Sequence, residues 1–422
     1  MHFFQYKGKK LFAEDTDIAQ IASDVGTPFY LYSYKTLIRH YNAFENGVKL
    51  LPHMVCYSVK ANSNITILKI FINKGWGLDI VSGGELYRAL MSGCPPNKIV
   101  FSGVGKTDEE IRRAIQAGIL MFNVESSQEL EEIHKVANHI GEIARISLRV
   151  NPDIDPETHP YIATGLFKNK FGIPYSEVKE IYKKANNLSN IEVVGISCHI
   201  GSQIIQLQPF IDAFKKLKEL YFDLKKMGIE IKYIDLGGGL GIPYKEEEKP
   251  PHPEEYGSNI AKEASDVDAT FIFEPGRVIV GNAGVLITRV LFTKDGADRR
   301  FVVVDAGMND LIRPSLYNSF HQVLPVIKKG GKETVSDLVG PICETGDFFA
   351  KNRKMPNFEK GDLVAILGAG AYGFSMSSNY NSRPRIPEIL VKEDKFWVIR
   401  VRESEEDLIR GENIPDHFKE EQ

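Results

Sequence analysis

Short apolar runs alternate with amphipathic stretches along residues 54–277 of this 422-residue chain. The apolar runs are rich in β-branched and aromatic residues, which predicts strands at 55–60, 77–82, 99–102, 121–124, 145–150, 193–200, 233–236 and 270–274. Between them, apolar residues recur at helical spacing, as in 107–117, 127–140, 176–186 and 209–226. Strands that alternate with helices pair in parallel, and eight such units favour a closed (β/α)8 barrel over an open, doubly wound sheet.

The pattern changes after Arg277. Strand-like runs with few helices between them follow at 278–292, 300–305, 322–328, 333–339, 362–367 and 388–402, and turn residues separate several of them. This predicts a second, mostly antiparallel β domain. We assign residues 36–277 to a cofactor-binding barrel and residues 1–35 and 278–422 to the β domain. The strand-like runs at 3–6 and 29–32 suggest that the first 35 residues join it, which the sequence alone leaves open.

Composition and charge exclude several classes of protein. The chain is 43% hydrophobic and 26% charged with a net charge of −4, and no Lys/Arg-rich run argues for a nucleic-acid partner. No segment approaches the roughly 20 apolar residues that cross a bilayer, and the N-terminus carries charge before a signal region could form. Four cysteines without paired spacing fit a reducing cytoplasm. We therefore expect a cytoplasmic protein with no membrane and no nucleic-acid partner.

Functional groups of a barrel gather at the C-terminal ends of its strands. That rule selects Lys60, Asp79, His199, residues 237–239 and residues 274–277. A lone lysine at a strand end usually reaches solvent. The functional alternative is a partly desolvated amine with a lowered pKa, suited to Schiff-base chemistry.

The other selected residues have similar pairs of interpretations. The glycines at 237–239 form either a flexible turn or a ring of backbone N–H groups around a phosphate. Glu274 ends a very apolar strand, so it needs a cationic partner, either a protonated pyridine nitrogen or a structural arginine. Gly276 and Arg277 add a candidate anion contact. His199 is either a core histidine or a group that stacks on a cofactor ring, with Ser202 within reach of a phosphate.

The β domain offers polar loops at 309–317, 340–347 and 368–373. Cys343 is either an inert thiol or, placed over a cofactor, a proton donor. Arg313 is either a surface charge or, near Arg277, part of a site for a dicarboxylate substrate. The ten histidines show neither a His-x-x-His nor an HExxH pattern, so no metal site is predicted, and no Gly-x-Ser-x-Gly elbow is present.

Six motifs in this order carry a resemblance to a known family: Tyr57-Ser-Val-Lys-Ala-Asn62, Cys198-His-Ile-Gly-Ser-Gln203, Gly237-Gly-Gly-Leu-Gly241, Glu274-Pro-Gly-Arg277, Cys343-Glu-Thr-Gly-Asp347 and Ala369-Gly-Ala-Tyr-Gly373. From about residue 25 to about residue 400, the chain resembles the fold-type III pyridoxal-phosphate decarboxylases, and most closely the diaminopimelate decarboxylases. Departures are small: Ser58 stands where alanine is common, Asn169 where serine often precedes Lys-Phe-Gly, and Ala306 where a glycine is usual.

The resemblance implies a role for each candidate residue. Lys60 would carry pyridoxal 5'-phosphate through a Schiff base, His199 would stack on the ring, and Glu274 would pair with the pyridinium nitrogen. The phosphate would lie among Ser202, Gly238, Gly239, Gly276 and Arg277. Tyr372 would contact cofactor and substrate.

The resemblance also implies a substrate site. Arg277, Arg313 and Tyr317 would bind the distal carboxylate of the substrate, and Glu344 its distal ammonium group. Cys343, or alternatively Lys60, would donate a proton. In the family this cysteine comes from the neighbouring subunit, so a homodimer with shared active sites is implied.

The implied reaction is the decarboxylation of meso-2,6-diaminopimelate to L-lysine and CO2, the final step of lysine biosynthesis. The alternatives are a sister decarboxylase of ornithine, arginine or a carboxylated polyamine, an amino-acid racemase on the same barrel, and a one-domain barrel that binds the cofactor without turnover. The sequence leaves open the kinetic constants, the stereochemical course, the breadth of substrate range, any oligomer beyond a dimer, and whether the loop 158–171 is a lid.

Overall fold

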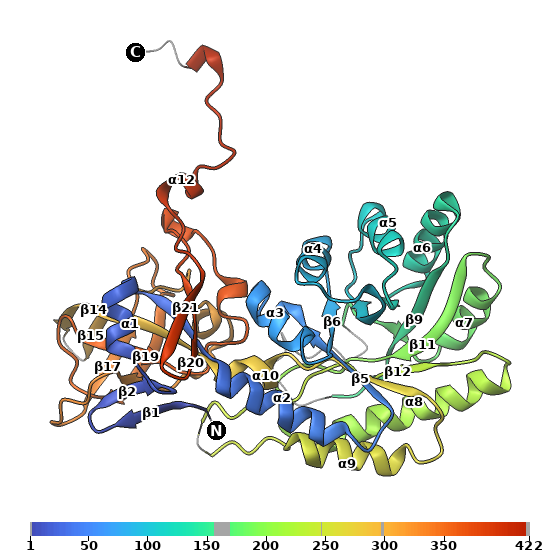
Figure 1. The fold of residues 1–422 in the computed structure, drawn as a ribbon, viewed down its shortest axis with the longest axis horizontal. Coiled ribbons are helices and arrows are strands. Elements are labelled where there is room, and N and C mark those ends of the chain that lie inside the picture. The colour runs from blue at the N-terminus through green and yellow to red at the C-terminus, as the bar shows by residue number, and fades with distance from the viewer. Residues whose placement is uncertain (1, 156–168, 246, 297–298, 419–422) are drawn as a thin grey trace. The chain divides into compact units, whose positions relative to one another are not determined.

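A computed structural model describes residues 2–155, 169–245, 247–296 and 299–418 (Figure 1). Backbone contacts divide the chain into two compact units. The first is built from residues 36–283 and 370–375, and the second from residues 2–35, 284–369 and 376 onward. Most of the loop 158–171 lies outside the described residues, so the structure does not bear on its role as a lid.

The first unit is a closed barrel of eight parallel strands. The strands are β5 (His53–Ser58), β6 (Gly77–Ile80), β7 (Ile99–Phe101), β8 (Met121–Val124), β9 (Ala144–Asn151), β11 (Ile191–Ser197), β12 (Tyr233–Asp235) and β13 (Thr270–Phe273). The last strand pairs with the first, with Phe271 opposite His53, and β10 (Ile173–Pro174) adds a short pairing to β9. The predicted (β/α)8 barrel is confirmed, and the open-sheet alternative is wrong.

Amphipathic helices surround these strands (Figure 1): α2 (Tyr34–Val48), α3 (Ile65–Ile72), α4 (Gly83–Met91), α5 (Asp108–Ala117), α6 (Ser127–Ile140), α7 (Val178–Asn186), α8 (Gln208–Lys226) and α9 (Pro253–Glu263). Their ends follow local sequence signals. Helix α5 begins with a capping box between Thr107 and Glu110 and ends at Gly118, which has a left-handed backbone (φ 74°). Short connecting helices are η1 (Val59–Ala61), η2 (Pro96–Lys98), α10 (Arg277–Val280), η3 (Gly281–Ala283) and η4 (Phe374–Met376).

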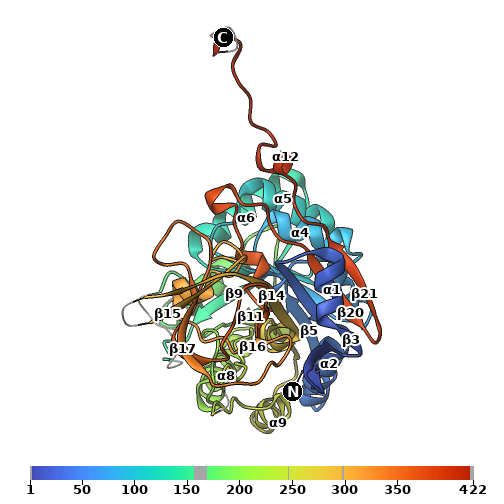
Figure 2. The same ribbon diagram turned by 90° about the vertical axis from the view of Figure 1, so that its left-hand side faces the viewer.

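The second unit contains a mostly antiparallel sheet, part of which Figure 2 shows. Its main path runs β18 (Phe348–Met355), β17 (Thr334–Val339), β15 (Arg300–Val304), β14 (Gly284–Asp295), β4 (Phe29–Ser33), β20 (Glu388–Lys392) and β21 (Lys395–Arg400), and off this path β19 (Leu363–Ile366) pairs with β14 and β16 (Val323–Pro325). A small sheet of β1 (Phe4–Lys7), β2 (Lys10–Ala13) and β3 (Thr16–Asp17) precedes α1 (Ile18–Val25). The other short helices are α11 (Arg313–Tyr317), η5 (Tyr380–Ser382), α12 (Glu405–Leu408) and η6 (Asp416–Phe418).

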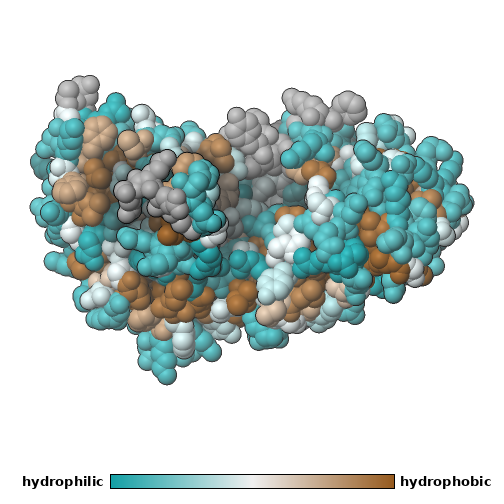
Figure 3. Space-filling model, turned by 90° about the horizontal axis from the view of Figure 1, so that it is seen from above, coloured by the Kyte–Doolittle hydropathy of each residue, from teal (hydrophilic) through white to brown (hydrophobic). Residues whose placement is uncertain are grey.

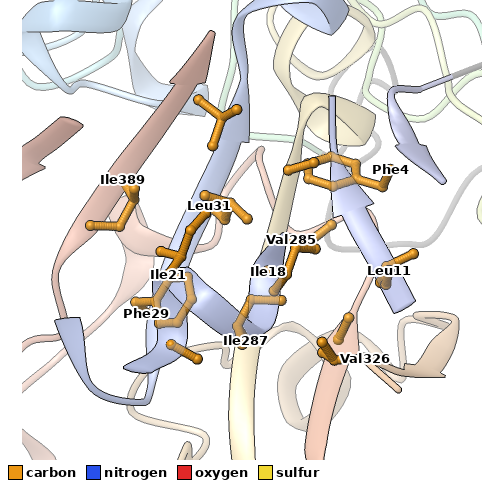
Figure 4. Close-up of a cluster of buried hydrophobic side chains, with 14 of the residues drawn as sticks. Phe4, Leu11, Ile18, Ile21, Phe29, Leu31, Val285, Ile287, Val326 and Ile389 are labelled. Carbon is orange, nitrogen blue, oxygen red and sulfur yellow. The ribbon is translucent and has the colours of Figure 1, made fainter. Parts of the chain in front are cut away.

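The N-terminal segment supplies much of the core of this second unit. Figure 4 shows its apolar side chains, among them Phe4, Ile18 and Phe29, packed with Val285 and Ile389 from much later in the chain. All five residues of β4 are buried, and this strand pairs with β14 on one side and β20 on the other. Burying one large apolar side chain contributes about 1.5–3 kcal/mol. The first 35 residues are therefore integral to this unit.

Two predicted strands differ from the observed structure, and one observed strand was not predicted. Residues 278–283 form α10 and η3 instead of strand, although Val278, Ile279 and Val280 are β-branched, because tertiary packing overrides propensity in a segment that begins at Gly276. The predicted single strand 388–402 is a hairpin that turns at Glu393 (φ 60°). Strand β18 was not predicted, because its exposed lysines and the left-handed Asn352 interrupt the apolar alternation.

Hydrophilic residues predominate on the face drawn in Figure 3, where apolar residues form separate patches. Among the described residues, none of the helices is both long enough and apolar enough to span a bilayer.

Candidate active site

One pocket in the barrel unit collects the predicted cofactor-binding residues. It is lined by Phe44, Ser58, Lys60, His199, Ser202, Phe210, Gly237, Gly238, Gly239, Leu240, Tyr256, Glu274, Pro275, Gly276, Arg277, Val278 and Tyr372. All nine residues that the sequence assigned to the cofactor are in this set. They come from the segments that follow strands β5, β11, β12 and β13, together with Tyr372 from the 370–375 segment of the same unit.

Lys60 lies in the short helix η1, two residues beyond the end of β5 and not on the strand itself. Its Nζ atom is 2.7 Å from Oδ2 of Asp79, a fully buried carboxylate on β6 that also accepts a hydrogen bond from the Ser58 hydroxyl at 2.9 Å. A buried carboxylate needs such donors, so Asp79 anchors the lysine amine inside the pocket.

The expected lowering of the Lys60 pKa is wrong. Burial does lower this pKa, but the negative charges of Asp79 and Glu274 outweigh burial, and the hydrogen bond to Asp79 acts in the same direction. The result is a pKa raised above the ordinary value for lysine. The amine of the cofactor-free protein is therefore a cation held by Asp79.

Glu274 follows β13 and is 5% exposed. Its carboxyl group forms a hydrogen bond with that of Asp235, and its Oε1 atom lies 3.4 Å from the side-chain nitrogen of Asn123. Burial, followed by the charges of Asp235 and Asp79, raises the pKa of Glu274 well above its usual range. No ion pair joins Glu274 to an arginine within the described part of the chain, so the structural-arginine alternative does not apply.

The turn after β12 can be built only from glycine at three consecutive positions, and a Cβ atom on the third, Gly239 (φ 113°), would lie 2.5 Å from the carbonyl oxygen of Gly201. A Cβ atom on Gly237 (φ 65°) would lie 2.7 Å from the carbonyl oxygen of Cys198, and one on Gly238 would lie 2.2 Å from that of Glu274. None of these distances is possible without moving backbone. The absence of side chains brings the backbone of Gly237, Gly238 and Gly239 to the pocket wall, where the N–H groups of Gly237 and Gly238 donate to Asp235 and His199.

His199 is a neutral ring beside this turn. Its Nδ1 atom accepts a hydrogen bond from the backbone N–H of Gly238 at 3.2 Å. Burial, together with the positive charges of Arg149 and Lys60, lowers the pKa of His199 well below its usual value. The imidazole is therefore uncharged at neutral pH, and its proton is on Nε2 because Nδ1 is an acceptor.

Arg277 is buried and contacts two side chains of the pocket, Ser202 and Tyr372, and a third, Tyr244, from outside its lining. Its Nη1 atom donates to the Tyr244 hydroxyl at 2.8 Å and its Nη2 atom to the Ser202 hydroxyl at 3.0 Å. The guanidinium carbon lies 4.9 Å from the ring centroid of Tyr372, a cation–π contact. These contacts place a permanent positive charge at the pocket, as an anionic ligand requires.

The other predicted substrate residues belong to the second unit, where they gather on two neighbouring segments. Arg313 begins α11, is 5% exposed, and has its guanidinium carbon 5.8 Å from the Tyr317 ring centroid. Helix α11 and the 343–347 loop are joined by a hydrogen bond of 2.5 Å from the Ser315 hydroxyl to the Gly346 carbonyl.

Cys343 and Glu344 stand in that 343–347 loop. Cys343 is exposed, and its backbone N–H donates to the side chain of Asn381 at 2.9 Å. The side chain of Glu344 forms a hydrogen bond with the Tyr380 hydroxyl. A thiol and a carboxylate are thus presented side by side on a tethered loop.

Sequence reasoning missed four residues that complete these contacts: Asp235, Asn123, Tyr244 and Tyr380. Asp235 ends β12, so the strand-end rule could have found it. Asn123 lies on β8 and donates to Asp235 at 2.8 Å, a contact that only barrel closure brings about. Within the described residues, no group of three or more His, Cys, Asp and Glu side chains is arranged to hold a metal ion.

Comparisons with known proteins agree with this geometry. The family described as "Pyridoxal-dependent decarboxylase, pyridoxal binding domain" matches residues 34–281. Diaminopimelate decarboxylase of Aquifex aeolicus is 49% identical over 403 residues, which cover 95% of each chain. That of Vibrio cholerae is 48% identical over 416 residues, covering 98% of this chain and 99% of the relative. The chain belongs to the diaminopimelate decarboxylase family.

Solved structures give the same result. Diaminopimelate decarboxylase from Helicobacter pylori complexed with L-lysine superposes with a TM-score of 0.90 at 43% identity, covering 93% of this chain and 98% of that one. The enzyme from M. jannaschii in complex with L-lysine gives a TM-score of 0.94 at 38% identity, covering 98% of both chains. The predicted family is confirmed over nearly the full length of the chain.

Pyridoxal phosphate is the cofactor of this family, and the residues present fit it. The glycine turn keeps this part of the pocket wall free of side chains, where a Cβ atom would clash with backbone, and the buried Arg277 guanidinium is there to attract a phosphate. The Lys60 amine lies in the same pocket and, once it has given up its proton, would form the covalent link to an aldehyde. Glu274, buried among other carboxyl groups, suits a ring nitrogen that carries a proton.

Proposed function

We propose that this protein decarboxylates meso-2,6-diaminopimelate to L-lysine and CO2, the final step of lysine biosynthesis. The observation that carries the proposal is the identity of 48–49% to diaminopimelate decarboxylases over 95–98% of the chain. The pocket in the barrel unit supports the proposal, because it combines an anchored lysine, a glycine turn with a buried arginine, and a buried carboxyl group.

Within this function each pocket residue takes one task. Lys60, whose amine is anchored at Asp79, would hold the cofactor covalently. Ser202, Gly238, Gly239, Gly276 and Arg277 bind the phosphate. His199, being neutral, packs against the ring without adding a second positive charge. Glu274 holds the ring nitrogen, and the bound cofactor supplies the electron sink for the electron pair that CO2 leaves behind. Tyr372 contacts both cofactor and substrate.

Arg277 of the barrel unit and three residues of the second unit recognise the far end of the substrate. Diaminopimelate carries a second carboxylate and a second ammonium group there. Arg277, Arg313 and Tyr317 bind the carboxylate, and Glu344 binds the ammonium group. Cys343 delivers the proton to the product; its exposure on a tethered loop supports this role.

We infer further that the protein is a homodimer with shared active sites, in which the loop of one subunit carries Cys343 into the site of the other. A cytoplasmic location is part of the same proposal, and the four free cysteines, three of them buried, support it.

The test of the function is CO2 release measured across meso-diaminopimelate, ornithine, arginine and carboxynorspermidine. We expect meso-diaminopimelate to be preferred strongly, because only it satisfies a carboxylate site and an ammonium site together. Arg313→Ala should raise the KM for meso-diaminopimelate and leave cofactor absorbance unchanged. Equal rates on all four substrates, or a preference for one without a distal carboxylate, would refute the substrate assignment.

A further inference from the structure

The carboxyl groups of Asp235 and Glu274 share one hydrogen bond, and Glu274 lines the pocket. Asp235 ends β12 and Glu274 follows β13, and these strands are neighbours in the barrel. Asp235 is 0% exposed and Glu274 is 5% exposed. Two carboxyl groups that meet in this way need a proton between them, since two buried carboxylates repel each other.

The surroundings decide which group carries that proton. Both oxygens of Asp235 already accept N–H donors: Oδ1 from the backbone of Gly237 at 2.9 Å, and Oδ2 from the side chain of Asn123 at 2.8 Å. The Asn123 side-chain nitrogen also donates to Ser102 at 3.1 Å, which fixes its amide group in place. Such an environment stabilises Asp235 as the carboxylate. Glu274 is therefore the group that is protonated and donates.

Charges beyond the pair act in the same direction. Asp79 adds a second negative charge near Glu274, while the nearby cation, Lys60, is paired with Asp79 at 2.7 Å. Burial is the largest cause of the shift at both carboxyl groups. It raises the pKa of Asp235 to about 6, against the opposing hydrogen bonds, and that of Glu274 well above its usual range. At neutral pH the pair thus keeps one proton, on Glu274.

We propose that Asp235 is a positioning residue for Glu274: its carboxylate keeps a proton on Glu274 in the cofactor-free protein, and Glu274 passes that proton to the ring nitrogen when the cofactor binds. The proton leaves the Glu274 carboxyl oxygen and bonds to the neutral ring nitrogen. The ring becomes a cation and Glu274 a carboxylate, while Asp235 stays a carboxylate held by Gly237 and Asn123. No proton comes from solvent. This inference rests on the proposed pairing of Glu274 with the ring.

Infrared spectroscopy of the cofactor-free full-length protein tests the stored proton directly. We expect a component of the protonated-carboxyl C=O absorption that persists at a pH above the titration of Asp310 and Glu85 and that is missing in Glu274→Gln. In Asp235→Asn, and in Asp235→Ala should the asparagine variant fail to fold, the pH midpoint of that band should fall by about one unit or more, because a neighbouring negative charge is gone. The matched control is Asp337→Asn, which removes a buried carboxylate from the other unit and should leave the midpoint unchanged.

A band that is the same in wild type and Glu274→Gln would overturn the proposal. So would an unchanged midpoint in both Asp235 variants, because burial alone would then hold the proton. Both results are obtained without cofactor or substrate, so they are independent of whether the chain decarboxylates diaminopimelate.

The pH dependence of cofactor rebinding provides a second readout. In the wild type, the ring receives its proton from Glu274, so this step takes up none from solvent. In Asp235→Asn, Glu274 loses its proton at a lower pH than in the wild type, and above that pH each pyridoxal phosphate that binds must take one proton from solvent. The dissociation constant of the variant should then rise by up to about tenfold more per pH unit than that of the wild type. Parallel pH profiles for the two proteins would contradict the proposed proton transfer.

Discussion

Replacing Gly238 by alanine is the most direct test of the role of the glycine turn in cofactor binding. The new Cβ atom would lie 2.2 Å from the carbonyl oxygen of Glu274 and 3.1 Å from its carbonyl carbon. Ordinary van der Waals contact begins at 3.4 Å, so the turn after β12 must move away from the segment after β13 until the Cβ atom and the carbonyl oxygen reach that distance. The displacement carries with it the Gly238 N–H, which now donates to His199 at 3.2 Å.

Forced overpacking of this kind costs about 1–3 kcal/mol. Because the displaced atoms line the pocket, most of that cost should appear as weaker cofactor binding. Each 1.4 kcal/mol is about a tenfold change in a dissociation constant, so we expect the dissociation constant of pyridoxal phosphate to rise about tenfold to a hundredfold. Titration of cofactor-free protein, followed by absorbance, measures it.

The matched control is Gly105→Ala, because a Cβ atom there meets nothing within 4 Å. That variant should bind the cofactor as the wild type does. If Gly238→Ala binds pyridoxal phosphate with wild-type affinity and unfolds at the wild-type temperature, the close contact with Glu274 is not what requires glycine, and the reasoning fails.

Two other variants test the site, and a third tests the stability of the fold. Lys60→Ala should abolish the absorbance of the covalently bound cofactor, and an unchanged spectrum would remove Lys60 from this role. Cys343→Ser should lower kcat by about a hundredfold or more with cofactor still bound, as loss of a general acid does; full activity would exclude the thiol as donor. Asp310 is buried and its pKa is raised from 3.8 to about 7, chiefly by burial, so it stabilises the fold below pH 4 and loses that contribution as the pH rises through 7. Asp310→Asn should flatten this part of the stability profile in thermal unfolding; a profile identical to wild type would contradict the assignment.

The barrel could be predicted because its strands are short β-branched runs at regular intervals, such as residues 99–102 and 121–124. The order of the strands along the chain then determines which loops lie at the same end of the barrel. This is why Lys60, His199 and Glu274, far apart in sequence, were expected together and do line one pocket. The ends of the strands were predicted less accurately. The apolar run continues through Val59, which placed Lys60 at the end of the strand, whereas the strand ends at Ser58 and η1 begins at Val59.

Features that depend on pairs of elements could not be predicted in this way. The contact of Asn123 with Asp235 joins β8 and β12, which are not neighbours in the barrel. No local sequence pattern at either residue predicts this contact. The same holds for the Lys60 pKa: burial of a lysine was foreseen, but the sign of the shift is set by Asp79 on the adjacent strand.

The pairing of Lys60 with Asp79 bears on which group delivers the final proton. A lysine with a lowered pKa would be mostly a neutral amine at neutral pH, whereas the raised pKa makes the free amine of Lys60 a cation that holds its proton tightly. When it is not bound to the cofactor, Lys60 would lie beside Asp79 as an ammonium group, which carries a proton but is a weak acid. Lys60 is therefore protonated and inside the pocket, which keeps it as the rival to Cys343 in this step. Substituting the thiol separates the two: a large loss of turnover with cofactor retained assigns the step to Cys343, and retained turnover assigns it to Lys60.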